Sequence, residues 1–199
     1  MITGLLDLPV YQIMRGVGDR TSDWMRMFKA LGYFPLWAAG AAALVMVDWP
    51  RRRLGIEHAL HRGWLLLAGA AASGIAAELL KLLFRRGRPP RGAAGWDGSY
   101  HVRSFLEGTF DSGGLGLPSS HVCVAFGGLW MLCWMFPRAI PVWLIFGGGV
   151  VLTRLMDGGH FLSDAWVSVC VSAAITYAIW RWEMAKQARI LRERIGGVD

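Results

Sequence analysis

The sequence predicts an all-α, polytopic integral membrane protein built as a single helix bundle. Hydrophobic residues make up 54% of its 199 residues and the mean hydropathy is +0.38, which is high for a soluble protein. Long runs almost without charge recur along the chain. The formal net charge is +7, typical of a membrane protein with arginines in its cytoplasmic loops. Because these basic residues flank apolar runs rather than forming one patch, nucleic acid is not an expected partner.

The first segment, residues 1–30, is predicted to lie in the membrane interface as one or two amphipathic helices. Leu6, Val10, Ile13 and Val17 form one apolar stripe, and a second stripe begins at Trp24. Charged residues interrupt this segment too often for an easy span, which favours a position along the membrane surface. A short first spanning helix packed inside the bundle is the alternative.

Five apolar runs within residues 31–182 are predicted to cross the membrane, which gives five spans, or six with an N-terminal helix. They are Ala30–Val47, Gly63–Phe84, Val122–Phe136, Ala139–Leu152 and Ala165–Trp180. Several are short for a hydrocarbon core of ~30 Å, so we expect each helix to continue into its flanks. Residues 92–117 form a long Gly-rich loop, which is either a lid or binding element or merely disordered.

The positive charge predicts the orientation. Residues 48–62, 137–138 and those after Trp180 fall on one side of the membrane and hold ten Lys and Arg. The positive-inside rule therefore places the basic tail, residues 183–199, in the cytoplasm. Residues 85–120 and 154–164 then face the periplasm or exterior, and a bacterial inner membrane is the expected location. The cysteines show no metal or redox spacing, and no cofactor is expected.

Six ionisable residues gather at one face under this topology. Each lies at or near the end of a predicted span, and alternating spans bring these ends together: Lys81, Arg88, His121, Arg154, His160 and Asp164. Ionisable residues at such positions are costly unless they serve a function. Three cations, two histidines and a carboxylate together indicate an anion site with acid–base capacity.

This set suits the hydrolysis of a phosphate ester. The three cations match the charge of a phosphate, and the helix start at Ser119 and Ser120 offers backbone N–H and hydroxyl donors. A neutral histidine is a nucleophile that a carboxylate can orient, and His160 and Asp164 are four residues apart. His121 is placed to give a proton to the leaving alkoxide.

Three motifs resemble those of the type 2 phosphatidic acid phosphatase (PAP2) family. Residues 81–89, KLLFRRGRP, fit the pattern KxxxxxxRP; residues 118–121, PSSH, are similar to PSGH; and residues 153–164, TRLMDGGHFLSD, are similar to SRxxxxxHxxxD. Ser120 stands where the family has Gly, and Thr153 where it has Ser. Neither change removes a charge or a histidine, so activity is expected to survive.

The resemblance implies a role for each residue. His160 forms a phosphohistidine, Asp164 orients it and His121 protonates the leaving group. The phosphate is held by Lys81, Arg88, Ser119, Ser120 and Arg154, no metal ion takes part, and the fold is a bundle of about six helices.

The function we expect is that of a membrane lipid phosphatase. Its candidate substrates are undecaprenyl pyrophosphate, phosphatidylglycerophosphate, phosphatidic acid and lipid A phosphates. A phosphotransferase that passes the group to another lipid, and a non-catalytic anionic-lipid binder or transporter, are the alternatives. Glu78, one turn before Lys81, is expected to pair with it. Arg85, Arg86 and Arg91 offer either a second phosphate site or interfacial anchors. The sequence does not fix the oligomeric state.

Overall fold

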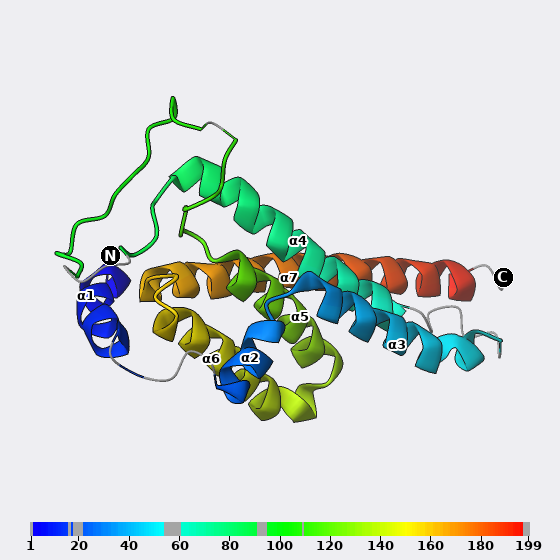
Figure 1. Ribbon diagram of the computed structural model, residues 1–199. Helices are drawn as coiled ribbons and strands as arrows, with labels where there is room; N and C mark the ends of the chain where they lie inside the picture. Colours follow the sequence, from blue (N-terminus) through cyan, green and yellow to red (C-terminus); the bar gives the residue numbers. More distant parts are fainter. Residues whose placement is uncertain are drawn as a thin grey trace.

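The computed structural model describes residues 2–15, 17, 22–53, 61–90, 95–108 and 110–196. Within them the chain forms α1 (Ile2–Arg15), α2 (Asp23–Ala30), α3 (Phe34–Arg53), α4 (His61–Phe84), α5 (Ser120–Met135), the 3₁₀ turn η1 (Pro137–Ala139), α6 (Ile140–Met156) and α7 (Leu162–Gly196). Figure 1 shows these helices as a bundle along which the long helix α7 runs. The only β-pairing among the described residues is two isolated bridges, so the all-α prediction is confirmed.

The described residues contain fewer candidate spans than the five to six expected. Three helical stretches among them are long and apolar enough to cross a membrane, namely α4, η1 with α6, and α7, or four if α2 and α3 form one broken span bent by 66°. Helix α5 has 16 residues, roughly 24 Å at about 1.5 Å per residue, which falls short of a full span. The protein therefore has the character of a helical membrane protein, whereas five to six spans are not confirmed.

Several helices extend beyond their apolar runs. Helix α3 continues to Arg53, α6 to Met156, and α7 from Leu162 as far as Gly196. The basic segment that we assigned to a tail is therefore mostly a continuation of α7. Arg, Lys, Glu, Gln and Ala are all good helix formers, so the helix does not need apolar residues to continue.

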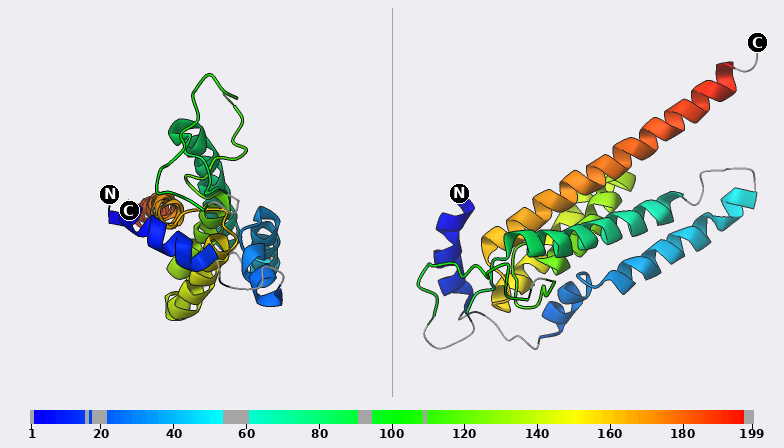
Figure 2. Two further views of the ribbon diagram at one scale, coloured as in Figure 1. Left: turned by 60° about the vertical axis from the view of Figure 1, so that its left-hand side comes forward. Right: turned by 90° about the horizontal axis from the view of Figure 1, so that it is seen from above.

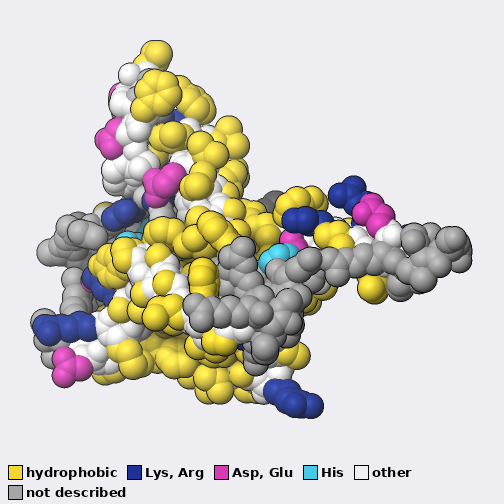
Figure 3. Space-filling model, turned by 90° about the vertical axis from the view of Figure 1, so that its right-hand side faces the viewer, with side chains coloured by type: hydrophobic (Ala, Val, Ile, Leu, Met, Phe, Trp, Pro, Cys, Tyr) yellow, Lys and Arg dark blue, Asp and Glu magenta, His cyan; other side chains and the backbone are white. Residues whose placement is uncertain are grey.

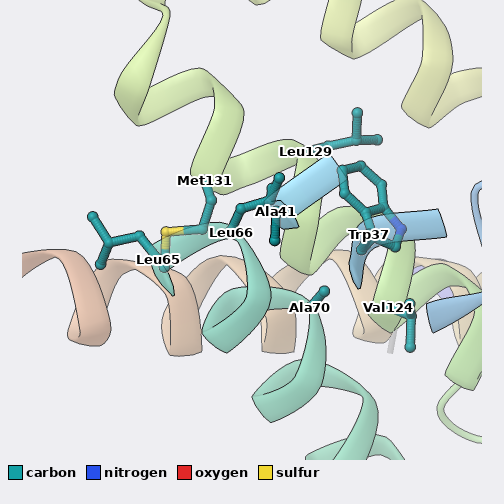
Figure 4. Packing of buried hydrophobic residues seen from close by; sticks show 8 residues of the cluster. All are labelled: Trp37, Ala41, Leu65, Leu66, Ala70, Val124, Leu129 and Met131. Atoms are coloured by element: carbon teal, nitrogen blue, oxygen red, sulfur yellow. The ribbon is translucent and has the colours of Figure 1, made fainter. Parts of the chain in front are cut away.

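The core lies where α3, α4 and α5 pack together. Its buried residues interlock as Figure 4 shows: Trp37, Ala41, Leu65, Leu66, Ala70, Val124, Leu129 and Met131. Helices α4 and α5 approach closely because Gly69 faces Gly127: a Cβ on Gly69 would lie 2.7 Å from the Gly127 carbonyl oxygen. Such close contact of small residues is how helices associate where lipid leaves no hydrophobic driving force.

Large apolar side chains also cover the outside of the bundle. Figure 3 shows hydrophobic side chains spread over much of one face. Those most exposed on α4 and α6 include Ile75, Leu79, Leu83, Leu144 and Ile145. A surface of this kind is unfavourable in water and suits contact with lipid tails.

The N-terminal helices pack against the end of the bundle. Helix α1 contacts α6 and α7, and α2 contacts α6. Figure 2 shows α1 lying across the start of α7, and Figure 1 shows the loop after α4 arching away from the same end before it returns to α5. The C-terminal ends of α4 and α6 and the N-terminal ends of α5 and α7 meet here, which positions the candidate site.

Candidate active site

All eight residues that the sequence singled out lie at this end of the bundle. Lys81 is in the last turn of α4, Arg154 in that of α6, and Ser119–His121 begin α5. His160 and Asp164 lie just before and within the first turn of α7. His121 interacts electrostatically with Arg154, His160 and Lys81, and His160 with Arg154 and Arg88. The expected convergence is therefore present in the structure.

His160 is held as a neutral ring with one nitrogen available. Its side chain is buried, and its Nδ1 lies 2.9 Å from the carbonyl oxygen of Gly116. A carbonyl only accepts, so the hydrogen is on Nδ1 and the lone pair is on Nε2. Burial lowers the pKa of His160; the nearby Asp164 carboxylate opposes this shift, and Arg154 and Arg88 add to it. The ring is consequently neutral at neutral pH, the form that acts as a nucleophile.

Asp164 forms a hydrogen bond with the backbone next to His160 rather than with the imidazole ring. Its Oδ2 lies 3.6 Å from His160 Nδ1, too far for the hydrogen bond that Gly116 makes. The same oxygen accepts the backbone N–H of Phe161 at 2.8 Å. Asp164 is fully buried and forms an ion pair with Arg86, which neutralises a charge that would be costly alone. Arg86 is thus a structural partner in this site.

Lys81 is tied to two neighbours in the site. Its ammonium donates to Glu78 Oε1 at 2.9 Å and to the hydroxyl of Ser120, so the expected Glu78–Lys81 pair is confirmed. Ser120 in turn donates to Glu78 at 2.5 Å. The serine that replaces the family's glycine therefore links the start of α5 to the end of α4. These hydrogen bonds hold the Lys81 ammonium beside the N-terminus of α5.

The two arginines of the set reach the site from different segments. Arg154 Nη1 and Lys29 Nζ both lie 3.3 Å from Asp157 Oδ2, so α2 contributes a cation beside Arg154. Arg88 donates from Nε to the carbonyl oxygen of Leu115 at 3.2 Å. Each guanidinium carries five N–H donors.

Two polar groups at the start of α5 have no partner among the described residues. Ser119 Oγ and His121 Nε2 are both buried and make no hydrogen bond there. Ser119 is anchored through its backbone instead, because its N–H donates to Ser168 Oγ at 2.8 Å. Buried polar atoms left unsatisfied are rare in native proteins, and a bound phosphate oxygen is the kind of group that completes such a set.

Two large cavities adjoin the site. One of about 590 Å³ lies beneath the loop after α4 and is lined by Arg88, Pro90, Gly95, Trp96, Asp97, Ser99, Tyr100, His101 and Phe161. The second, of about 370 Å³, is almost entirely apolar and lies between α3, α4 and α5, where its lining includes Phe34, Ile75 and Val124. Glu78 and Ser120 also line it, so it leads to the Lys81 bridge.

Two of the three arginines that were expected to bind a second phosphate or to anchor the protein at the interface make contacts within the protein instead. Arg85 is buried and donates to the carbonyl oxygens of Arg103 and Glu107, which ties down the loop. Arg86 pairs with Asp164. Neither is therefore placed as a second phosphate site, and Arg91 lies outside the described residues.

Our reading of the sequence missed several contributors to the site. The Gly116 carbonyl is a backbone group, and Ser168 and Lys29 stand in stretches that we read as span and surface. Ser168 belongs to a row of hydroxyls at i, i+4 spacing with Ser172 and Thr176, a pattern that the sequence could have shown as a buried polar stripe.

Comparison with known proteins gives one match. A family model described as PAP2 superfamily matches residues 62–188, more than half of the chain. This range includes all eight candidate residues, whereas α1, α2 and α3 lie outside it. Searches of curated proteins and of solved structures gave no match.

Proposed function

The chain belongs to the PAP2 superfamily, and from this premise we propose that it is an integral membrane lipid phosphatase. Membership supports phosphatase activity in general. The observation that carries the proposal is the state of His160: a buried, neutral ring whose Nδ1 is held by Gly116 and whose Nε2 is available beside Arg88 and Arg154. Such a ring is a nucleophile next to the cations that bind phosphate.

The proposed reaction proceeds in two steps. In the first, the lone pair of His160 Nε2 forms a bond to phosphorus while the P–O bond to the leaving group breaks. The leaving oxygen, an alkoxide from a monoester or a lipid phosphate from a pyrophosphate, takes a proton from protonated His121. Lys81, Arg88 and Arg154, with Ser119 and Ser120, hold the charged phosphate oxygens.

The second step releases the phosphate. Water attacks the phosphohistidine, the P–N bond breaks and His121 takes the proton of the water. Inorganic phosphate leaves, and His160 returns to its neutral form with the hydrogen still on Nδ1. Each step uses the chain's own groups, and we propose that no metal ion takes part.

The apolar cavity between α3, α4 and α5 supports a lipid as the substrate. Its lining is hydrophobic until it reaches Glu78 and Ser120, so it suits the part of an acyl or prenyl chain nearest the head group while the phosphate lies among the cations. A phosphate group joined to a hydrocarbon chain is common to undecaprenyl pyrophosphate, phosphatidylglycerophosphate, phosphatidic acid and lipid A phosphates. Together with the positive-inside rule, the arrangement leads us to propose a bacterial inner membrane with the site facing the periplasm.

The test is phosphate release by the detergent-purified protein from a panel of these lipids. With a radiolabelled phosphate, a phosphoramidate that is labile in acid should be trapped on the protein. His160→Ala should lose both turnover and the label. The control His61→Gln, which keeps a donor for Glu183 at the other end of α4, should retain both. An undiminished rate in His160→Ala would remove the proposed nucleophile.

Two other functions are tested by the same assay. A phosphotransferase would pass the label from the phosphohistidine to an added lipid alcohol, giving a phosphorylated lipid in place of free phosphate. An anionic-lipid binder or transporter would retain lipid without turnover and would tolerate His121→Ala. His121 Nε2 has no hydrogen-bond partner within the described part of the chain, which favours chemistry over binding alone.

A further inference from the structure

Helix α1 carries a carboxylate that is completely buried at the active-site end. Asp7 has 0% of its surface exposed, although an acidic residue on an amphipathic helix ordinarily faces water. Its Oδ1 accepts the backbone N–H of Ser163 at 2.7 Å. Its Oδ2 accepts the hydroxyls of Ser163 at 2.5 Å and of Tyr100 at 2.6 Å. One carboxylate therefore joins α1 to α7 and to the loop after α4.

The partner in α7 is the residue directly before Asp164. The N–H of Ser163 is in the first turn of α7 and has no acceptor within the helix, and Asp7 supplies one from 156 positions away in the sequence. The helix N-terminus also favours a negative charge at this point. Asp7 thus caps α7 from another helix and fixes the direction in which its first turn enters the site.

The same network reaches Arg86. Arg86 Nη2 donates to Ser163 Oγ at 2.7 Å and also pairs with Asp164. The ring of Tyr100 lies 4.7 Å from the Arg86 guanidinium carbon. The partly buried setting of the Tyr100 hydroxyl, and then its bond to Asp7, raise its pKa to about 12. That hydroxyl consequently stays protonated and donates to Asp7 at physiological pH.

Further contacts place α1 beside the nucleophile. Tyr11 donates from its hydroxyl to the carbonyl oxygen of Pro90 at 3.0 Å and packs edge-on against Trp96 at 5.9 Å. A small cavity of about 10 Å³ is lined by both Asp7 and His160. Helix α1 therefore contacts both the loop after α4 and helix α7.

We propose that Asp7 is a positioning residue of the active site, which acts through Ser163 and Tyr100 to hold Arg86 and Asp164 in place beside His160. Helix α1 then contributes to the catalytic rate, although it lies outside the residues that the family model matches. The inference rests on the proposed phosphatase function for its kinetic test, and on hydrogen exchange for a test that needs no turnover.

The decisive variant is Asp7→Asn, with Gln12→Ala as the control. Asn has nearly the same shape but turns one of the two acceptor oxygens into a donor that meets other donors. Gln12 is exposed on the same helix. Phosphate release is measured per binding site for orthovanadate, a phosphate mimic. We expect the rate per site to fall about 10- to 100-fold in Asp7→Asn, as it does when reacting groups are displaced by about 1 Å, and to stay at the wild-type value in Gln12→Ala.

The binding of vanadate separates positioning from folding. The cations that bind phosphate lie outside the Asp7 network, so vanadate affinity should change by no more than about threefold. A purely structural role would lower the number of vanadate sites and leave the rate per site unchanged, and that result would overturn the proposal. Tyr100→Phe keeps the ring over Arg86 but removes one of the three hydrogen bonds, and it should cause a smaller loss.

Hydrogen exchange of the peptide that contains Ser163 completes the experiment. Exchange of this amide should be faster in Asp7→Asn and unchanged in Gln12→Ala, because the carboxylate is its acceptor. Equal exchange in wild type and Asp7→Asn would overturn the proposal. A wild-type protein that releases no phosphate from any lipid would refute the phosphatase function, while the exchange result would still decide the role of Asp7.

Discussion

Gly32 offers a direct way to displace His121 without changing any polar group. It is buried in the bend between α2 and α3, and a Cβ placed on it would lie 2.7 Å from His121 Cδ2 and 2.8 Å from His121 Cβ. Few real Cβ contacts are closer than 3.4 Å, so in Gly32→Ala the imidazole must move by about 0.7 Å or the bend must open. Tyr33 packs edge-on against the same ring at 5.0 Å, which limits where it can go.

The expected result is a loss of activity together with a loss of stability. A proton donor displaced by close to 1 Å costs up to about 100-fold in rate, so we expect phosphate release by Gly32→Ala to fall about 10- to 100-fold. The overpacking itself should cost about 1–3 kcal/mol of unfolding free energy. The measurements are phosphate release per vanadate-binding site and thermal unfolding in detergent.

The matched control is Gly148→Ala in α6. A Cβ there would meet nothing within 4 Å, and Ala is the better helix former by about 1 kcal/mol. This variant should therefore keep its activity and lose no stability. A rate for Gly32→Ala within twofold of the wild type would refute the view that the α2–α3 bend confines His121.

Three further outcomes are expected. Arg86→Ala leaves the fully buried Asp164 without its ion pair and should cost about 3–5 kcal/mol of unfolding free energy. The control is Arg26→Ala, whose ion pair at 4.0 Å is exposed, and it should cause no measurable change in thermal unfolding. Burial lowers the pKa of His160 below its usual 6.5 and the neutral ring attacks, so the acid-side decline of kcat/KM should have its midpoint below pH 6.5. An acid-side midpoint at or above pH 6.5 would contradict this. No group of three His, Cys, Asp or Glu suited to a metal occurs among the described residues, and EDTA should leave the rate unchanged; inhibition that Mg²⁺ or Zn²⁺ reverses would count against a metal-free reaction.

The helices and the charged residues at their ends could be predicted because both leave a local pattern. Apolar runs mark helices in a membrane, and the spacing of Lys81 to Arg88 and of His160 to Asp164 is a property of the chain itself. The number of spans was harder to predict, because an apolar helix as short as α5 gives the same signal as a full span. The N-terminal segment was read as interfacial from its charges, and nothing local showed that Asp7 turns inward.

What the sequence determined by itself is the set of candidate residues and that they meet at one end of a helical bundle. Only the tertiary structure decided how each is held. The acceptor for His160 Nδ1 is the Gly116 carbonyl rather than Asp164. Asp164 instead forms an ion pair with Arg86, and Asp7 caps the first turn of α7. A backbone carbonyl looks alike at every position in a sequence, and contacts between distant segments depend on how whole helices pack. These are the features that the spacing of residues does not encode.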